Sequence, residues 1–233
     1  METSRKGIFV VLEGNDGSGK ATQTELLLQR LRAEGREAEK IDFPRYDNNT
    51  FGSLIGECLA GKHGDFLNLD PKIASSLYAL DRFESGAHIR EQLEKGVTVV
   101  ADRYAGSNQI HQGGKIENEK QREEFLLWLE KVEFGILDIP RPNLTVYLRV
   151  PIETSLKLLG EKRAAKNIEL GERERDVVEE DRSYLERSIA TADWLVKREG
   201  WGVVECMEGE VLRSREDIHE SIWGEFTRAT SAG

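Results

Sequence analysis

A glycine-rich run near the start of the chain, GNDGSGKAT, has the residue types and spacing of a loop that binds phosphate groups. Gly14, Gly19 and Lys20 match the pattern G-x-x-x-x-G-K-[ST]. Glycines let backbone N–H groups curve around a phosphate, the following helix presents its positive end, and the lysine adds a mobile positive charge. The run therefore predicts a nucleotide-binding loop made of Gly14, Asn15, Asp16, Gly17, Ser18, Gly19, Lys20, Ala21 and Thr22.

One position of this loop departs from the pattern. Ala21 stands where a serine or threonine hydroxyl would bind Mg²⁺, and Thr22 is one position too far along. Because Mg²⁺ is often held by one or two carboxylates together with phosphates and water, a carboxylate can replace the hydroxyl. Asp16 and Asp102 are the candidates, although the former could be a turn residue and the latter a helix cap. The alternative is a loop that has lost its chemistry.

Arginines follow the predicted strands at several points. Arg45 lies in FPRY, Arg103 lies in DRY, and Arg82 lies on a predicted helix with Tyr78 on the same face. Guanidinium groups bind phosphate in a bidentate way, so three arginines near one sheet edge of an acidic protein predict a second phosphate site. Each of them could instead form a surface salt bridge.

Aromatic and polar residues accompany these arginines. Phe43, Tyr46 and Tyr78 could stack on a nucleotide base, and Ser107 and Asn108 could hydrogen-bond to its edge. Core packing is the alternative for each aromatic residue. The shared position beyond the strand ends favours a base pocket.

The elements that must position these residues alternate between strands and helices. Strands are predicted at residues 7–13, 38–43, 97–101, 144–150 and 202–206. Helices are predicted at residues 20–34, from Asp70-Pro71 to Gly96 with a break near Gly86, around EEFLLWLEKV, and in two charged stretches after the fourth strand. This order predicts an α/β fold, with a parallel sheet covered by helices on both faces and ligands beyond the carboxyl ends of the strands.

Length and composition set the remaining limits. The 233 residues suit one domain, here residues 1–226, and residues 227–233 resemble a disordered tail. A net charge of −10 argues against general binding to nucleic acid. Two cysteines far apart favour a reducing compartment, and no apolar run is long enough for a signal peptide or a membrane span. We therefore expect a cytoplasmic protein with no membrane partner.

The motifs, in their order, resemble the thymidylate kinase family of P-loop nucleoside monophosphate kinases. The resemblance is carried by EGNDGSGKATQ, FPRY, ALDR, DRYAGSNQIHQGGK, PRPNLTVYL and RERDVVEED. It implies a three-layer P-loop NTPase fold with a five-stranded parallel sheet and a helical lid. It also implies phosphoryl transfer from ATP to dTMP with Mg²⁺, in a homodimer. The helix with Phe125, Leu126, Trp128 and Leu129 could belong to the core or to that interface.

The resemblance also implies roles for single residues. Lys20 and the loop amides would hold the donor phosphates, Asp16 would approach the sugar 3′-OH and the metal, and Arg103 would bind the acceptor phosphate. Tyr78 would stack on thymine and Arg82 would hydrogen-bond to it. The acceptor site as a whole would comprise Phe43, Arg45, Tyr46, Tyr78, Arg82, Arg103, Ser107, Asn108 and His111.

A charged segment at about residues 160–180 resembles the lid of the family. Some members carry a catalytic arginine directly after the loop aspartate, where this chain has Gly17. Such members use basic residues of the lid instead, so the resemblance implies Arg163 and Arg173 as catalytic residues. Glu179 matches a glutamate near the metal or the sugar. The other interpretation is a solvated charged helix.

Three departures from the family keep alternatives open. They are Ala21, Asn143 in place of an aspartate before the fourth strand, and His111 in place of a tyrosine or phenylalanine near the sugar. The last substitution leaves the rejection of a ribose 2′-OH open. The alternatives are a kinase for dUMP, dGMP or another deoxynucleotide, and an inert nucleotide-binding relative.

Overall fold

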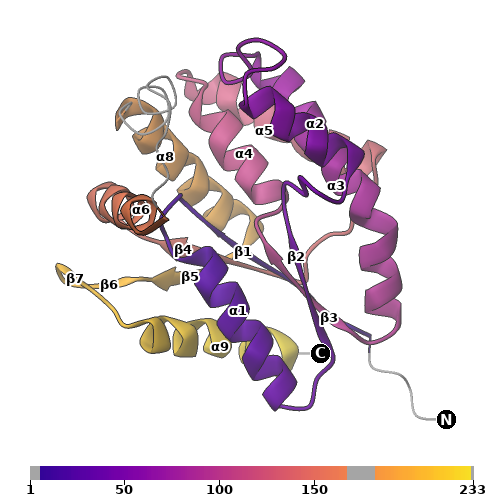
Figure 1. The fold of residues 1–233 in the computed structure, drawn as a ribbon, viewed down its shortest axis with the longest axis vertical. Coiled ribbons are helices and arrows are strands. Elements are labelled where there is room, and N and C mark those ends of the chain that lie inside the picture. Colours follow the sequence, from indigo (N-terminus) through magenta and orange to yellow (C-terminus); the bar gives the residue numbers. More distant parts are fainter. Residues whose placement is uncertain (1–5, 167–181, 232–233) are drawn as a thin grey trace.

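The computed structural model describes residues 6–166 and 182–231. Within these residues, a five-stranded parallel sheet has the strand order β2-β3-β1-β4-β5 (Figure 1). The strands are β1 (Phe9–Gly14), β2 (Ala38–Asp42), β3 (Thr98–Asp102), β4 (Leu144–Arg149) and β5 (Gly202–Glu205). The predicted strands, the parallel sheet and the α/β P-loop fold are confirmed.

β1 is central because its first four residues, FVVL, form a continuous apolar run, and all six residues of the strand are buried. A continuous apolar sequence is typical of a strand that is covered by helices on both faces of the sheet. β1 pairs in parallel with β3 on one side and β4 on the other, with Val10 opposite Val100 and Leu144. The loop after β1 therefore opens at the middle of the carboxyl edge, beside the end of β3.

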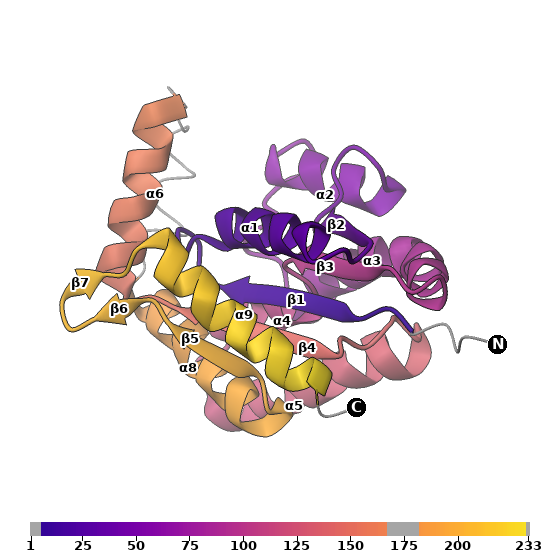
Figure 2. The ribbon, with the colours of Figure 1, turned by 90° about the horizontal axis from the view of Figure 1, so that it is seen from below.

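Helices cover both faces of the sheet (Figures 1 and 2). On one face, Leu27 and Leu31 of α1 (Lys20–Ala33) and Ile222 and Phe226 of α9 (Arg215–Ser231) pack against the strands. On the other face lie α3 (Pro71–Glu94), α4 (Ala105–Gly114) and α8 (Arg182–Glu199). The remaining elements are α2 (Thr50–Leu59), α5 (Glu119–Glu130), the π-helix η1 (Lys131–Ile136), α6 (Ile152–Lys166), β6 (Met207–Glu208) and β7 (Val211–Leu212).

Several elements differ from the sequence predictions. α3 is continuous through Gly86, where a break was predicted, because one glycine costs a helix only about 1 kcal/mol and the buried Ala79 and Ile89 on either side hold the helix in place. The tail prediction does not hold for residues 227–231, which continue α9 as far as Ser231. Phe226 anchors that helix in the core, and the Thr227 hydroxyl donates to Trp223 O at 3.0 Å. α2, α4, α9 and the β6–β7 hairpin were not predicted.

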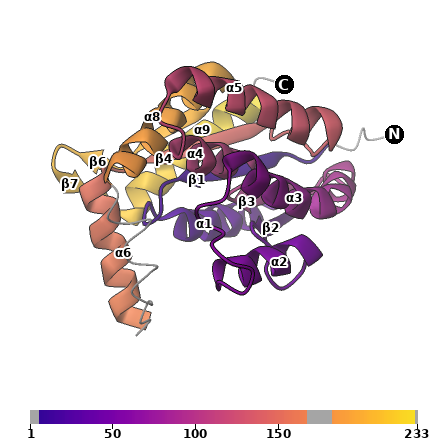
Figure 3. The same cartoon turned by 90° about the horizontal axis from the view of Figure 1, so that it is seen from above.

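The helix around EEFLLWLEKV is α5 followed by η1, and three of its apolar residues belong to the core. Phe125, Leu126 and Leu129 are buried within the chain and pack together. Of the segment that resembles a lid, residues 160–166 end α6, which extends away from the rest of the domain (Figure 3). In the part of the chain that the structure describes, no helix combines the length and apolar character needed to cross a membrane.

Candidate active site

The glycine-rich loop lies between β1 and α1, as predicted. Gly19 has a φ of 88°, a conformation that glycine adopts without strain, and a Cβ on Gly14 would lie 2.9 Å from Leu148 O. Lys20 Nζ lies inside the curve of the loop and donates to the carbonyls of Gly14 and Asn15 at 2.8 and 2.7 Å. Burial, with Arg103 nearby, lowers the pKa of Lys20 to about 8, although Asp16 acts in the opposite direction.

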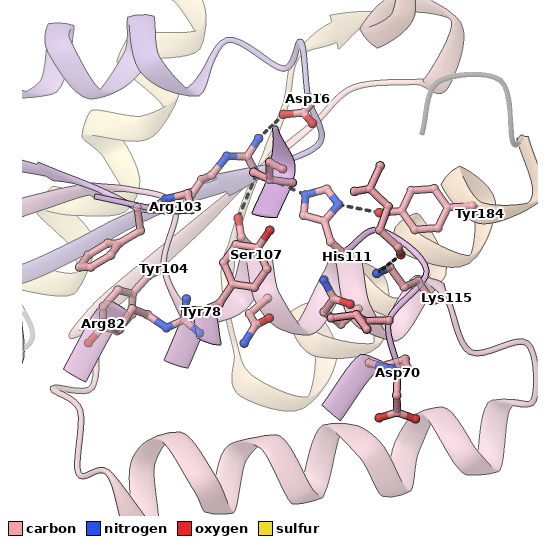
Figure 4. Close-up of a pocket in the computed structure, with 18 of the residues that line it drawn as sticks. Asp16, Asp70, Tyr78, Arg82, Arg103, Tyr104, Ser107, His111, Lys115 and Tyr184 are labelled. Carbon is pink, nitrogen blue, oxygen red and sulfur yellow. Dashed lines mark hydrogen bonds and ion pairs between the residues drawn. The ribbon is translucent and has the colours of Figure 1, made fainter. Parts of the chain in front are cut away.

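Arg103 lies at the turn that joins β3 to α4. Its φ of 68° is in the left-handed region, which non-glycine residues seldom adopt and which is often found at functional sites. The guanidinium group donates to Asp16 of the glycine-rich loop, to Ser107 Oγ at 3.1 Å and to His111 Nε2 at 3.3 Å (Figure 4). The positive charge of Arg103 holds the pKa of Asp16 well below its ordinary value.

Glu13, the residue before the glycine-rich loop, fixes the start of α4. Its carboxylate accepts hydrogen bonds from the backbone N–H groups of Tyr104 and Ser107 at 2.9 Å and from the Ser107 hydroxyl at 2.6 Å. The side chain is fully buried, and burial raises its pKa although these hydrogen bonds oppose the shift. Sequence reasoning read Glu13 only as a strand end, because its partners are 91 and 94 residues away.

A cavity of about 700 Å³ opens beside Arg103 and contains most of the predicted acceptor site. The predicted residues that line it are Asp16, Phe43, Tyr46, Tyr78, Arg82, Arg103, Ser107, Asn108 and His111. Further lining residues, not predicted as site residues, include Gln112, Lys115, Tyr184 and Arg187. Figure 4 shows Arg103 and Asp16 at one side of this cavity and Lys115 and Asp70 at another.

Arg82 and Asn108 are held on one wall by a glutamate that sequence reasoning missed. Glu133 of η1 accepts from Arg82 Nε and an Arg82 terminal nitrogen at 2.8 and 2.7 Å, and from Asn108 Nδ2 at 2.9 Å. Arg82 and Glu133 are almost fully buried. No motif could have identified Glu133, because it resembles any other glutamate of a polar helix.

The orientation of the Asn108 amide follows from its partners. Nδ2 donates to Glu133 and to Ser75 O at 3.2 Å, and both partners are acceptors only, so the nitrogen must face them. The carbonyl Oδ1 is buried and has no hydrogen-bond partner among the described residues. A buried acceptor in this state is a feature that a ligand with an N–H group would satisfy.

Arg45 is the predicted acceptor-site residue that does not line the cavity. Its guanidinium donates to Ser85 Oγ of α3 at 3.3 Å, and its Nε is buried without a partner among the described residues. Its backbone N–H donates to Asp81 Oδ2 at 3.2 Å. In this structure Arg45 braces the segment after β2 against α3.

The remaining predicted residues are placed as follows. Asp102 ends β3 and is partly buried, and Ala21 and Thr22 are exposed on α1. Asn143 accepts from the Phe9 N–H at 2.8 Å, a contact that holds the start of β1 to the segment before β4. The backbone of Arg163 lies in α6, whereas Arg173 and Glu179 lie outside the described residues.

The chain matches known proteins over most of its length. A sequence model of the thymidylate kinase family matches residues 12–212. A thymidylate kinase of Mycobacterium tuberculosis is 33% identical over 196 residues, which cover 84% of this chain and 88% of that protein. A thymidylate kinase of Homo sapiens is 29% identical over 224 residues, covering 94% and 89% of the two chains.

The fold has a close counterpart among solved structures. The structure of thymidylate kinase from Candida albicans superposes with a TM-score of 0.70 at 21% identity, covering 97% of this chain and 95% of that one. At this identity the similarity concerns the fold, and the sequence matches carry the assignment to a family.

Proposed function

Because this chain belongs to the thymidylate kinase family, we propose that it transfers the γ-phosphoryl group of ATP to dTMP and forms dTDP and ADP. The observation that supports this most strongly is the position of Arg103. It joins the glycine-rich loop, through Asp16, to the cavity wall, through Ser107. A donor phosphate held by the loop and an acceptor phosphate bound by Arg103 would therefore meet at one edge of the sheet.

The polar wall of the cavity favours a base that presents a donor beside an acceptor. Asn108 Oδ1 offers an unused acceptor, and Arg82, whose Nε and one terminal nitrogen bind Glu133, retains further N–H donors. Thymine presents N3–H next to a carbonyl oxygen, which matches this pair. Uracil and guanine present the same pair of groups, a ring N–H next to a carbonyl oxygen, so dUMP and dGMP are the acceptors to test against dTMP.

The chemistry needs little covalent work from the protein. The attacking group is already an anionic phosphate oxygen, so the reaction requires no general base. Lys20 and the loop N–H groups would hold the donor phosphates, and Arg103 would place the acceptor phosphate in line with them. Alignment and charge neutralisation are the main sources of rate in phosphoryl transfer.

The carboxylates at this edge fit a Mg²⁺ ion that stays largely on the phosphates. Ala21 supplies no hydroxyl, but Asp16, whose side chain is 52% exposed, and Asp102 at the end of β3 would supply oxygen ligands. In the described part of the chain no three metal-binding side chains cluster, which agrees with a site completed by phosphates and water. Bound there, Mg²⁺ would neutralise charge on the β- and γ-phosphate oxygens.

Replacing Asp16 with asparagine is expected to weaken the dependence of turnover on Mg²⁺. The substitution removes one of two carboxylates and leaves the amide oxygen as a poorer ligand. Steady-state rates titrated with Mg²⁺ at saturating ATP should show a higher half-saturating concentration. Asp138→Asn, at an exposed residue outside the cavity, is the matched control. An unchanged titration for Asp16→Asn would contradict the role of Asp16.

The low pKa of Lys20 predicts an alkaline limit to activity. The protonated amine is the form that binds phosphate, and its pKa in the free protein is lowered to about 8 by burial. We therefore expect kcat/KM for ATP to fall as the pH rises through that value, since kcat/KM reports groups of the free enzyme. Lys20→Arg should not show this decrease in kcat/KM at alkaline pH, because arginine stays charged. The same decrease in both proteins would argue against Lys20 as its origin.

A coupled assay of ADP release tests the function directly. Each deoxynucleoside monophosphate is supplied in turn with ATP and Mg²⁺, and we expect the highest kcat/KM with dTMP. Turnover with dGMP or dUMP in preference to dTMP would replace the proposed acceptor. Absence of turnover with every acceptor would indicate a nucleotide-binding relative that has lost transfer activity.

We also propose that the protein forms a homodimer through α3. Ile73 and Phe83 are 57% and 51% exposed, and with the partly exposed Leu80 they form an apolar stripe on the outer side of this helix. Light scattering should give twice the chain mass for the native protein and the chain mass for Phe83→Glu. Leu127→Glu, at an exposed leucine of α5, is the control that should remain dimeric. A monomeric native protein would rule the proposal out.

We also propose a cytoplasmic location, which the reduced state of the two cysteines supports. Cys58 and Cys206 are both free and buried, as is usual for proteins of reducing compartments. We further propose that the whole catalytic unit is a single domain.

A further inference from the structure

His111 lies between the reaction-site arginine and the first turn of α8. Its Nε2 is 3.3 Å from a terminal nitrogen of Arg103, and its Nδ1 is 3.1 Å from the hydroxyl of Tyr184 (Figure 4). His111 and Tyr184 both line the cavity. Two elements that are far apart in sequence, the turn after β3 and the start of α8, are therefore joined through one imidazole ring.

The partners of the ring decide its tautomer. A guanidinium group has N–H donors and no acceptor, so Nε2 must carry the lone pair that receives the Arg103 hydrogen bond. The ring proton of a neutral imidazole then lies on Nδ1, from which it donates to the Tyr184 oxygen. Burial and the charge of Arg103 lower the pKa of His111 to about 4, although Asp16 opposes this, so the ring is neutral near pH 7.

We propose that His111 is a positioning residue for Arg103, and that the Tyr184 hydroxyl holds it in the Nδ1–H tautomer that this task requires. The kinetic part of the proposal rests on the proposed phosphoryl transfer to a nucleoside monophosphate. A phenylalanine at this position could present neither an acceptor to Arg103 nor a donor to α8. The ring nitrogen on the arginine side has no proton to donate, so His111 does not serve as an acid there. The substrate phosphate already offers an anionic oxygen, so no base is required. His111 therefore acts through Arg103.

The orientation of Arg103 explains why a second acceptor matters. One terminal nitrogen of Arg103 has two protons, and the structure directs them to Ser107 Oγ and His111 Nε2, both on α4. Ser107 in turn donates to the buried Glu13, so its oxygen presents a lone pair to the arginine. The two acceptors fix the plane of the guanidinium, while the other terminal nitrogen donates to Asp16. Without His111, the plane is held on the α4 side by a single contact.

The tautomer of His111 can be determined by NMR, without an assay of enzyme activity. Long-range ¹H–¹⁵N spectra of the protein labelled at its four histidines separate the Nδ1–H form, the Nε2–H form and the imidazolium by the shifts of the ring nitrogens. The His111 signals are assigned by their loss in His111→Phe. We expect the Nδ1–H form at neutral pH. An Nε2–H form or an imidazolium would overturn the proposal, and this result does not depend on which acceptor the enzyme uses.

Kinetics test the consequence for Arg103. His111→Phe should lower kcat/KM for dTMP by about 10- to 100-fold, because a small misplacement of a substrate-positioning group has effects of this size. The KM for ATP should be nearly unchanged. His111→Gln keeps a side-chain acceptor within reach of Arg103 and should recover most of the loss. Tyr184→Phe removes one hydrogen bond and should lower kcat/KM by up to about 10-fold.

The matched control is His88→Gln, because His88 lies on the surface of α3 and binds Glu39 at 2.7 Å. It should leave all kinetic constants unchanged. Equal values of kcat/KM for His111→Gln and His111→Phe would contradict the acceptor role, even if both are active. If one variant fails to fold, by circular dichroism, the loss of signals in the other assigns His111, and the tautomer of the native protein decides the proposal. A native protein inactive with every acceptor but carrying the Nδ1–H form would refute the function and leave this geometry intact.

Discussion

Replacing Arg103 with alanine is expected to lower kcat/KM for dTMP by more than about 100-fold, since a preorganised charge that holds a reacting phosphate contributes several kcal/mol. The guanidinium is the group that lies between the glycine-rich loop and the acceptor cavity. Its backbone adopts a φ of 68°, which the sheet and α4 must enforce. Steady-state kinetics with varied dTMP at saturating ATP measure the loss.

Two further variants make the result specific. Arg103→Lys keeps the charge but loses the planar fork, so it should recover only part of the activity. Arg90→Ala removes an exposed arginine of α3 that binds Asp138 outside the cavity, and it should leave kcat/KM unchanged. A loss below about threefold for Arg103→Ala would be too small for a phosphate-binding group and would remove the main support for the proposed function.

Replacing Glu133 with leucine is expected to destabilise the protein by about 3–5 kcal/mol, because removing one partner of a buried ion pair leaves the other charge uncompensated. The Arg82–Glu133 pair is almost completely buried, with side-chain exposures of 3% and 1%. The same variant should raise the KM for dTMP, since Glu133 orients both Arg82 and Asn108 at the predicted base site. Urea unfolding and steady-state kinetics measure the two effects.

The double variant Arg82→Met with Glu133→Leu separates stability from recognition. Replacing a whole buried ion pair with apolar side chains is often neutral or stabilising, so the double variant should regain most of the lost stability. It should keep the raised KM for dTMP, because the donor proposed to bind the base is gone. Glu91→Gln is the matched control, because Glu91 of α3 forms an exposed pair with Lys95. It should change stability and KM little. A double variant with native KM would show that Arg82 does not contact the base.

The elements that were predicted correctly depend on a few residues that are neighbours in the sequence. The run FVVLEG and the glycines after it were identified because hydrophobic continuity and glycine spacing are properties of a few neighbouring residues. The same holds for Asp70-Pro71, where the Asp70 carboxylate accepts the Lys72 N–H at 2.9 Å as a helix cap. The break at Gly86 was predicted from the glycine alone, and the packing of α3 on the sheet through Ile89 and Leu93 overrode it.

The sequence by itself determined the five strands of the sheet, the phosphate-binding loop and the edge of the sheet at which the site forms. Tertiary structure alone decided which side chains act together: Arg82 with Glu133, 51 residues apart, Glu13 with Ser107, 94 residues apart, and His111 with Tyr184, 73 residues apart. It also directed Arg45 to Ser85 of α3. The physical reason is range: propensity and periodicity act over a few residues, whereas a hydrogen bond between distant residues exists only once packing has brought donor and acceptor to about 3 Å from each other.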